Sequence, residues 1–110
     1  MSTLYAPHPP NRKRLAEVVD EMARLGPPKI RAVRDGDVYF AIEGSHRIAA
    51  ADRLRMTPVI KEVAMTDRVR HDFDDIGDRN TVAEIVSYLS GDHPNGPSGI
   101  SWVAYEFEDL

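Results

Sequence analysis

The sequence predicts a small α+β domain, in which helices pack on a mixed β-sheet. Three observations predict this class. Apolar residues recur at helical spacing in three separate segments, within residues 15–25, 48–54 and 82–89. Runs rich in β-branched and aromatic residues lie between them, separated by glycine and proline. The order helix, hairpin, helix, strand over the first 65 residues then favours a layered structure of sheet and helices.

The chain begins with a proline-rich stretch. Residues 1–10 carry three prolines and no periodicity, which predicts a flexible lead-in. An amphipathic helix is expected next, because Asn11 is a good N-cap residue, the apolar positions of 15–25 share one face, and Gly-Pro-Pro at 26–28 ends the pattern.

Two short strands are expected to form a hairpin after this helix. Residues 30–34 predict the first strand, and Asp-Gly-Asp at 35–37 predicts the turn. The β-branched and aromatic run at 38–42 predicts the second, buried strand.

A second helix is expected to follow the hairpin. Ser45 is the predicted N-cap, and the helix is expected to run to about Arg55, with small alanines that allow close approach to the sheet. Residues 59–65 predict another strand.

The last third of the chain predicts one helix and one strand. Thr81 and Glu84 have the spacing of a capping box, and the apolar face that follows predicts a helix ended by Gly91. Residues 100–107 predict a final strand. The expected loops are residues 71–80 and 92–99.

Size and composition restrict the function. A chain of 110 residues suits one core, so residues 11–110 are expected to be a single domain, with a motif-bearing part at 11–65 and the C-terminal helix and strand within 80–108. The absence of cysteine excludes disulfides and thiolate catalysis. No window approaches the roughly 20 apolar residues of a membrane span, and the N-terminus lacks the apolar stretch of a signal peptide. We therefore expect a cytoplasmic protein.

Charge is distributed unevenly along the chain. The net charge of −4 argues against a surface made to bind nucleic acid throughout. Residues 1–65 hold eleven Lys/Arg against eight Asp/Glu, a net +3, whereas residues 66–110 hold three against ten, a net −7. This asymmetry suggests an anionic ligand for the first half, with solvated surface charge as the alternative.

The tetrapeptide Gly-Ser-His-Arg at 44–47 carries the strongest functional signal. A strand that passes through glycine into a helix leaves backbone N–H groups at the positive end of the helix dipole. Gly44 permits close approach of a ligand, Ser45 adds a hydroxyl, His46 can donate to a phosphate oxygen, and Arg47 adds a guanidinium. These residues predict an anion cradle. In the alternative, Ser45 only caps the helix, and His46 and Arg47 are solvated.

The segment 38–63, VYFAIEGSHRIAAADRLRMTPVIKEV, resembles the N-terminal domain shared by ParB partition proteins, sulfiredoxins and ParB-like free serine kinases. Gly44, Arg47 and Ala50 match the partition proteins' G-x-x-R-x-x-A pattern, and the tetrapeptide is similar to the G-C-H-R motif of sulfiredoxins. With the preceding helix and strand, the resemblance covers residues 11–65. It implies a ParB/sulfiredoxin-like fold and a site for the phosphates of ATP or CTP, as triphosphate or diphosphate, with Mg²⁺, held by the four residues of the tetrapeptide.

Departures from these families limit the activity. Ser45 stands where sulfiredoxins have their catalytic cysteine, so sulfinic acid reduction is not expected. A chain of this length also has no room for the DNA-binding and dimerisation domains of partition proteins. The free serine kinases need a carboxylate base, and Glu43 is the nearest carboxylate, as base or as Mg²⁺ ligand. The candidate catalytic residues are therefore Glu43 and His46, although Glu43 also fits a strand end in solvent.

Two functions from different classes stay open. The first is a small nucleotide-binding protein, with phosphotransferase or nucleotide hydrolase activity as its catalytic form. The second is a non-catalytic regulatory or accessory module that acts through a protein or DNA partner, or as a homodimer. Nuclease activity is a third, less favoured reading.

Two further charged clusters give weaker evidence of a function. The acidic run Asp72, Asp74, Asp75 and Asp78 beside His71 lacks the spacing of an EF-hand loop and is expected to be a solvated loop, not a metal site. The basic triplet at 12–14 is too short for a recognisable nucleic-acid face.

Overall fold

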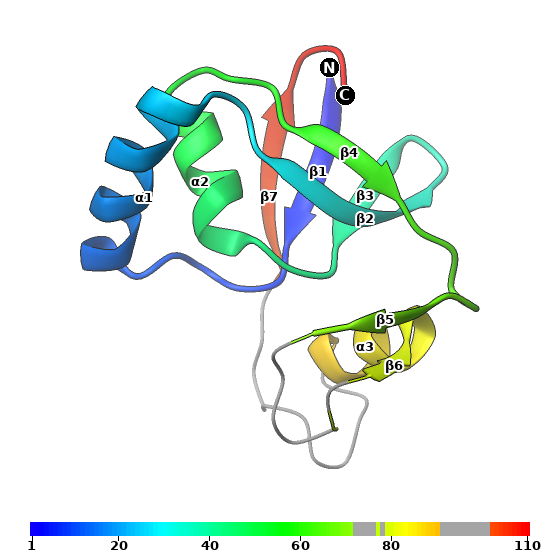
Figure 1. Cartoon of the computed structure of the whole chain (residues 1–110). Helices are drawn as coiled ribbons and strands as arrows, with labels where there is room; N and C mark the ends of the chain where they lie inside the picture. Colours follow the sequence, from blue (N-terminus) through cyan, green and yellow to red (C-terminus); the bar gives the residue numbers. More distant parts are fainter. Residues whose placement is uncertain (72–76, 78, 91–101) are drawn as a thin grey trace.

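The computed structural model describes residues 1–71, 77, 79–90 and 102–110. The described chain has an α+β architecture, as the sequence predicts. A mixed five-stranded sheet carries two helices on one face, and a two-stranded sheet with a third helix lies beside one end of it (Figure 1).

The five-stranded sheet mixes parallel and antiparallel pairs. Its strand order is β4-β2-β3-β1-β7, where β1 pairs parallel with β3, β2 pairs parallel with β4, and the pairs β2/β3 and β1/β7 are antiparallel. The strands are β1 (Ser2–Ala6), β2 (Lys29–Asp35), β3 (Val38–Ala41), β4 (Val59–Glu62) and β7 (Val103–Phe107). The predicted hairpin and the two later strands are confirmed within the described residues, with β4 shorter than expected.

The helices α1 (Arg12–Leu25) and α2 (Ser45–Arg53) cover one face of this sheet (Figure 1). The predicted caps of α1 are confirmed, because the Asn11 side chain accepts a hydrogen bond from the Arg14 amide and the Gly26 amide donates to the Met22 carbonyl. The buried side of both helices packs against alternate residues of the strands. The largest described core cluster includes Leu4, Leu15, Val18, Met22, Ile30, Ile48, Ala50 and Phe107.

The prediction of a flexible lead-in at residues 1–10 is wrong for residues 2–6, because they form strand β1. β1 lies inside the sheet, between β3 and β7, and the side chains of Leu4 and Ala6 have no exposed surface. The prolines follow this strand instead of interrupting it. The error has a physical reason: five residues carry little periodicity, and both partners of β1 are more than thirty residues away in the sequence.

A second, smaller core cluster involves the two-stranded sheet and α3, which lie below the five-stranded sheet in Figure 1. β5 (Arg68–Arg70) pairs antiparallel with β6 (Arg79–Thr81), which continues into α3 (Val82–Leu89). α3 begins with the predicted capping box of Thr81 and Glu84, while the short strands on either side of the acidic run were not predicted. The residues that form this cluster are Val33, Ile42, Val63, Val82, Ile85, Tyr88 and Leu89.

Some predictions fall outside the described residues. Gly91, the loop at 92–99 and the first residues of the predicted last strand are among them, and so are the four aspartates of the acidic run. Within the described residues, no helix combines the length and the apolar character needed to cross a membrane.

Candidate anion-binding site

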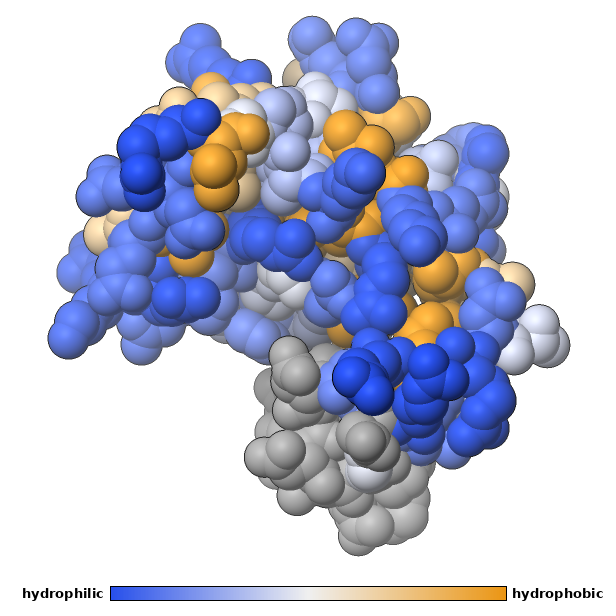
Figure 2. All heavy atoms as spheres, viewed as in Figure 1, coloured by the Kyte–Doolittle hydropathy of each residue, from blue (hydrophilic) through white to orange (hydrophobic). Residues whose placement is uncertain are grey.

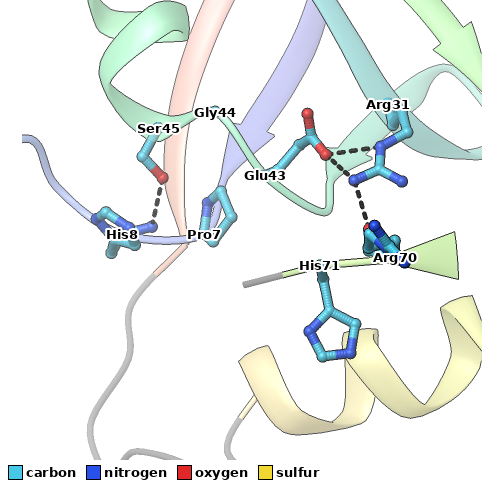
Figure 3. A pocket seen from close by; sticks show the side chains of 8 residues that line it. All are labelled: Pro7, His8, Arg31, Glu43, Gly44, Ser45, Arg70 and His71. Atoms are coloured by element: carbon cyan, nitrogen blue, oxygen red, sulfur yellow. Dashed lines mark hydrogen bonds and ion pairs between the residues drawn. The ribbon is translucent and has the colours of Figure 1, made fainter. Parts of the chain in front are cut away.

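A cleft of about 290 Å³ lies where the five-stranded sheet meets the start of α2 and the end of β5 (Figure 3). This volume is at the lower end of the range of small-molecule sites, about 300–1,000 Å³. Glu43 and the first two residues of the predicted tetrapeptide, Gly44 and Ser45, line it. They are joined by residues from three other segments, namely Pro7 and His8 after β1, Arg31 of β2, and Arg70 and His71 at the end of β5.

Gly44 makes the turn from β3 into α2. Its backbone is left-handed, with φ 82° and ψ 27°, a conformation that favours glycine. A Cβ atom at this position would lie 2.8 Å from the Ile30 Cδ1 atom and 3.3 Å from the Arg47 Nη2 atom. The turn therefore requires glycine for two reasons. Its backbone angle favours glycine, and the buried side chain of Ile30 leaves no room for a Cβ atom.

The start of α2 differs from the predicted one in its cap. Gly44, not Ser45, is the N-cap residue, and no side chain caps the helix. Ser45 is buried in the first turn, where its Oγ accepts a hydrogen bond from the His8 amide at 3.3 Å. The left-handed turn at Gly44 explains the difference, because it places Ser45 one position inside the helix, with its hydroxyl directed at the segment after β1 (Figure 3).

The first amides of α2 are left without acceptors. The Ile48 amide is the first to donate within the helix, to the Gly44 carbonyl at 2.8 Å. Among the residues that the structure describes, no acceptor contacts the amides of Ser45, His46 or Arg47. Such N–H groups at a helix start attract negative charge.

Glu43 is enclosed by two arginines. Its Oε2 atom accepts hydrogen bonds from the Arg31 Nε atom, at 2.6 Å, and from Arg31 Nη2, and its Oε1 atom accepts from Arg47 Nη2 at 2.8 Å. All three side chains are partly buried. Glu43 is therefore not a strand end surrounded by solvent, which was one expectation. As the predicted base, it has both carboxylate oxygens in hydrogen bonds with arginines. Through these ion pairs, Glu43 connects β2 with the first turn of α2.

Arg47 lies away from the cleft. Its Nη1 atom donates to the Lys29 carbonyl at 3.1 Å, and its side chain lines a separate groove of about 280 Å³ between α1 and the Pro27–Pro28 segment. Arg47 therefore contacts Glu43, which lines the cleft, but does not line the cleft itself. Direct contact between Arg47 and a ligand in the cleft stays a prediction.

His46 joins the starts of the two helices. Its Nε2 atom accepts a hydrogen bond from the Asn11 amide at 3.0 Å, so this nitrogen is unprotonated and the proton is on Nδ1. The ring lies edge-on to that of His8, with centroids 5.9 Å apart. Burial lowers the pKa of His46, and the nearby His8 and Arg14 lower it further. Its predicted catalytic role is not tested by these contacts.

The described residues of the cleft do not supply a magnesium site made of side chains. The described residues contain no group of three or more His, Asp or Glu side chains that could hold a metal ion. Among the described residues, Glu43 is the one carboxylate that lines the cleft, and arginines engage both of its oxygens. Mg²⁺ prefers carboxylate oxygens and ligand phosphates, so an ion here would depend on the phosphates.

Comparison of the chain with protein-family models, with curated proteins and with solved structures finds no match. The resemblance to the ParB and sulfiredoxin families thus stays a prediction carried by the tetrapeptide and its setting.

Five residues of the cleft lie outside the sequence prediction. They come from segments other than the tetrapeptide and are Pro7, His8, Arg31, Arg70 and His71. The sequence places His71 only beside the acidic run, in an expected solvated loop. The structure instead buries it, with its imidazole on the α3 side of β5 and its Nε2 atom 2.6 Å from the Asn80 Oδ1 atom (Figure 3). No local pattern marks these residues, because only the folded chain brings them together.

Proposed function

We propose that this protein binds the phosphate groups of a nucleotide in the cleft at the start of α2, as a small ParB/sulfiredoxin-like module. One observation carries the proposal: helix amides without acceptors begin beside a cleft that has an excess of cationic side chains. Arg31 and Arg70 are arginines of its lining. The single carboxylate among its described lining residues, Glu43, already pairs with Arg31 and Arg47. Unbalanced positive charge and helix amides together favour a phosphate.

The size of the cleft favours recognition of phosphates over enclosure of a whole nucleotide. A volume of about 290 Å³ is small for a nucleotide site, so we expect the base to contribute less than the phosphates. Inorganic pyrophosphate should therefore compete with ATP and CTP.

Binding without catalysis is the better-supported form of this function. A general base needs an oxygen that can reach the proton it removes. Both oxygens of Glu43 accept hydrogen bonds from arginines, and the Nε2 atom of His46 accepts one from the Asn11 amide. These contacts favour the regulatory or accessory module over the phosphotransferase.

The test is calorimetry and thermal unfolding with phosphate, pyrophosphate, ATP and CTP, each with and without Mg²⁺. A ligand at 100 times its dissociation constant should stabilise the protein by about 2.7 kcal/mol. Arg31→Gln removes a cation that lines the cleft and should weaken binding about tenfold or more. Arg24→Gln is the control, because Arg24 is exposed in the last turn of α1, far from the cleft.

Three outcomes are informative. If Arg47→Gln weakens binding more than Arg31→Gln does, the phosphate lies against Arg47 and not in the cleft. If binding is accompanied by release or transfer of phosphate, the catalytic form of the function is correct. If none of the four compounds binds at millimolar concentration, the proposal is wrong.

A further inference from the structure

Three arginines share one face of the short β5–β6 sheet. In its register, Arg70 pairs with Arg79 and Val69 pairs with Asn80. Since side chains alternate along a strand, Arg68, Arg70 and Arg79 lie on the face opposite Val69, which packs against the second core cluster. All three are exposed, and Figure 2 shows strongly hydrophilic atoms gathered over β5 and β6. We name this set the arginine face.

The arginine face is electrostatically unfavourable by itself. Like charges directly opposite each other on an antiparallel pair destabilise it, and Arg70 and Arg79 are such a pair. Within the part of the chain that the structure describes, no carboxylate forms an ion pair with any of the three. The nearby Glu84 accepts hydrogen bonds from Asn80 and Thr81, and the charge of Arg68 helps to lower its pKa, but it forms no ion pair with Arg70 or Arg79. An anion at Arg70 would relieve this repulsion.

Arg70 also occupies the wall of the cleft that faces the start of α2. Gly44 and Ser45 form one wall, and Arg70 and His71 line the cleft from the end of β5 (Figure 3). Arg31 connects the two walls, because its Nη2 atom contacts Glu43 on one side and donates to the Arg70 carbonyl at 2.9 Å on the other. The Arg70 backbone is thus held at the cleft.

We propose that Arg70 completes the anion site from this second wall, so that a terminal phosphate monoester bridges β5 and the start of α2. This inference rests on the proposed phosphate binding and adds the ligand class. A phosphate monoester carries a charge of about −1.5 to −2 at pH 7, whereas a phosphodiester carries one charge. Arg70 and the helix amides match the higher charge together with Arg31, whose charge Glu43 balances only in part because Glu43 also pairs with Arg47. The site should therefore prefer monoesters to diesters.

The test compares AMP with 3′,5′-cyclic AMP, which share a base and differ in having a monoester or a diester, and adds inorganic pyrophosphate. Binding is measured by calorimetry at pH 7.5 on the wild type, Arg70→Gln and Arg79→Gln. The two variants each remove one positive charge from the same pair of opposed residues in the β5–β6 sheet, but Arg79 does not line the cleft. Circular dichroism checks that both are folded.

We expect the wild type to bind AMP and pyrophosphate about tenfold or more tightly than cyclic AMP. Arg70→Gln should lose most of this preference, and Arg79→Gln should stay within about twofold of the wild type. Hydrogen exchange of the β5 and β6 amides should slow when pyrophosphate binds.

Each other result has a definite meaning. Binding of pyrophosphate that is unchanged in Arg70→Gln, or weakened equally in both variants, overturns the role of Arg70 and leaves the proposed function intact. Equal affinity of the wild type for AMP and cyclic AMP overturns the monoester preference. Failure of every phosphate to bind overturns both proposals.

Discussion

Gly44 joins the backbone geometry of the turn to the packing behind it. A residue with a Cβ atom would have to hold φ near 82° and would also crowd the Ile30 side chain, which has no exposed surface. A strained left-handed residue costs about 1–3 kcal/mol, and overpacking costs about as much again. Gly44→Ala should therefore lower the free energy of unfolding by about 2–6 kcal/mol, measured by urea denaturation.

Two control variants separate the cost of the backbone angle from the cost of crowding Ile30. Gly36 has φ 60° and nothing within 4 Å of an added Cβ, so Gly36→Ala should show only the backbone cost, about 1 kcal/mol. Ile30→Val removes the Cδ1 atom that the new methyl group would meet. The double variant Ile30→Val/Gly44→Ala should lose less stability than the sum of the single variants. Strict additivity would show that Ile30 is not the obstacle.

His46 gives the fold a dependence on pH. Its pKa in the folded protein is lowered from 6.5, the value expected in the unfolded chain. At a pH between the folded pKa and 6.5, the unfolded chain therefore binds more protons than the folded one. The free energy of unfolding should decrease as the pH falls below 6.5 and level off below the folded pKa. Protonation of Nε2 also removes the acceptor of the Asn11 amide.

His46→Gln tests this directly. The amide oxygen of glutamine can accept the Asn11 N–H but does not titrate, so the loss of melting temperature between pH 7.5 and pH 5.5 should be smaller in the variant. Other histidines contribute equally to both proteins. The same pH dependence in both would contradict a role for His46.

At the scale of elements, β1 is where sequence and structure differ most. Leu4 has no exposed surface in the middle of the sheet, so Leu4→Ala should reduce the free energy of unfolding by about 2–5 kcal/mol. Leu25→Ala makes the same chemical change at a side chain that is 74% exposed and should cost about 0.5 kcal/mol or less. Equal effects in chemical denaturation would mean that β1 adds little to the core, as a lead-in would.

Elements with local signals were predictable. The Asn11 cap, the Gly26 stop and the capping box of Thr81 and Glu84 each depend on residues within one turn of a helix, and all are found. β1, β5 and β6 have three to five residues each and are stabilised by partners elsewhere in the chain. Short segments of this kind have too few residues for a periodicity to show.

The candidate site divides in the same way. The glycine turn and the start of α2 follow from four adjacent residues, so their place was predictable. The pairing of Glu43 with Arg31 and Arg47 depends on the β2–β3 register and on the first turn of α2, and the approach of Arg70 depends on how the second cluster packs. The sequence alone could not show that Glu43 is engaged or that Arg47 lies outside the cleft.

At the scale of the whole molecule, the described chain has two core clusters of unequal size. Among the described residues, thirteen buried side chains form the first and seven form the second, so the second should open more readily. Its sheet has only two strands, which is marginal without further packing. Native-state hydrogen exchange should therefore show a lower opening free energy for α3 than for β1, β2 and β3.

Two isoleucines, both with no exposed surface, make a matched test of this difference: Ile85 in α3 and Ile48 in α2. Each change to alanine should cost about 2–5 kcal/mol locally. Ile85→Ala should speed exchange mainly in α3, because that helix can open while the five-stranded sheet stays closed, whereas Ile48→Ala should speed exchange throughout the sheet and α2. If both variants speed exchange equally in every element, the two clusters unfold as one unit, and α3 and β5 would then hold the second wall of the cleft as firmly as the sheet holds the first.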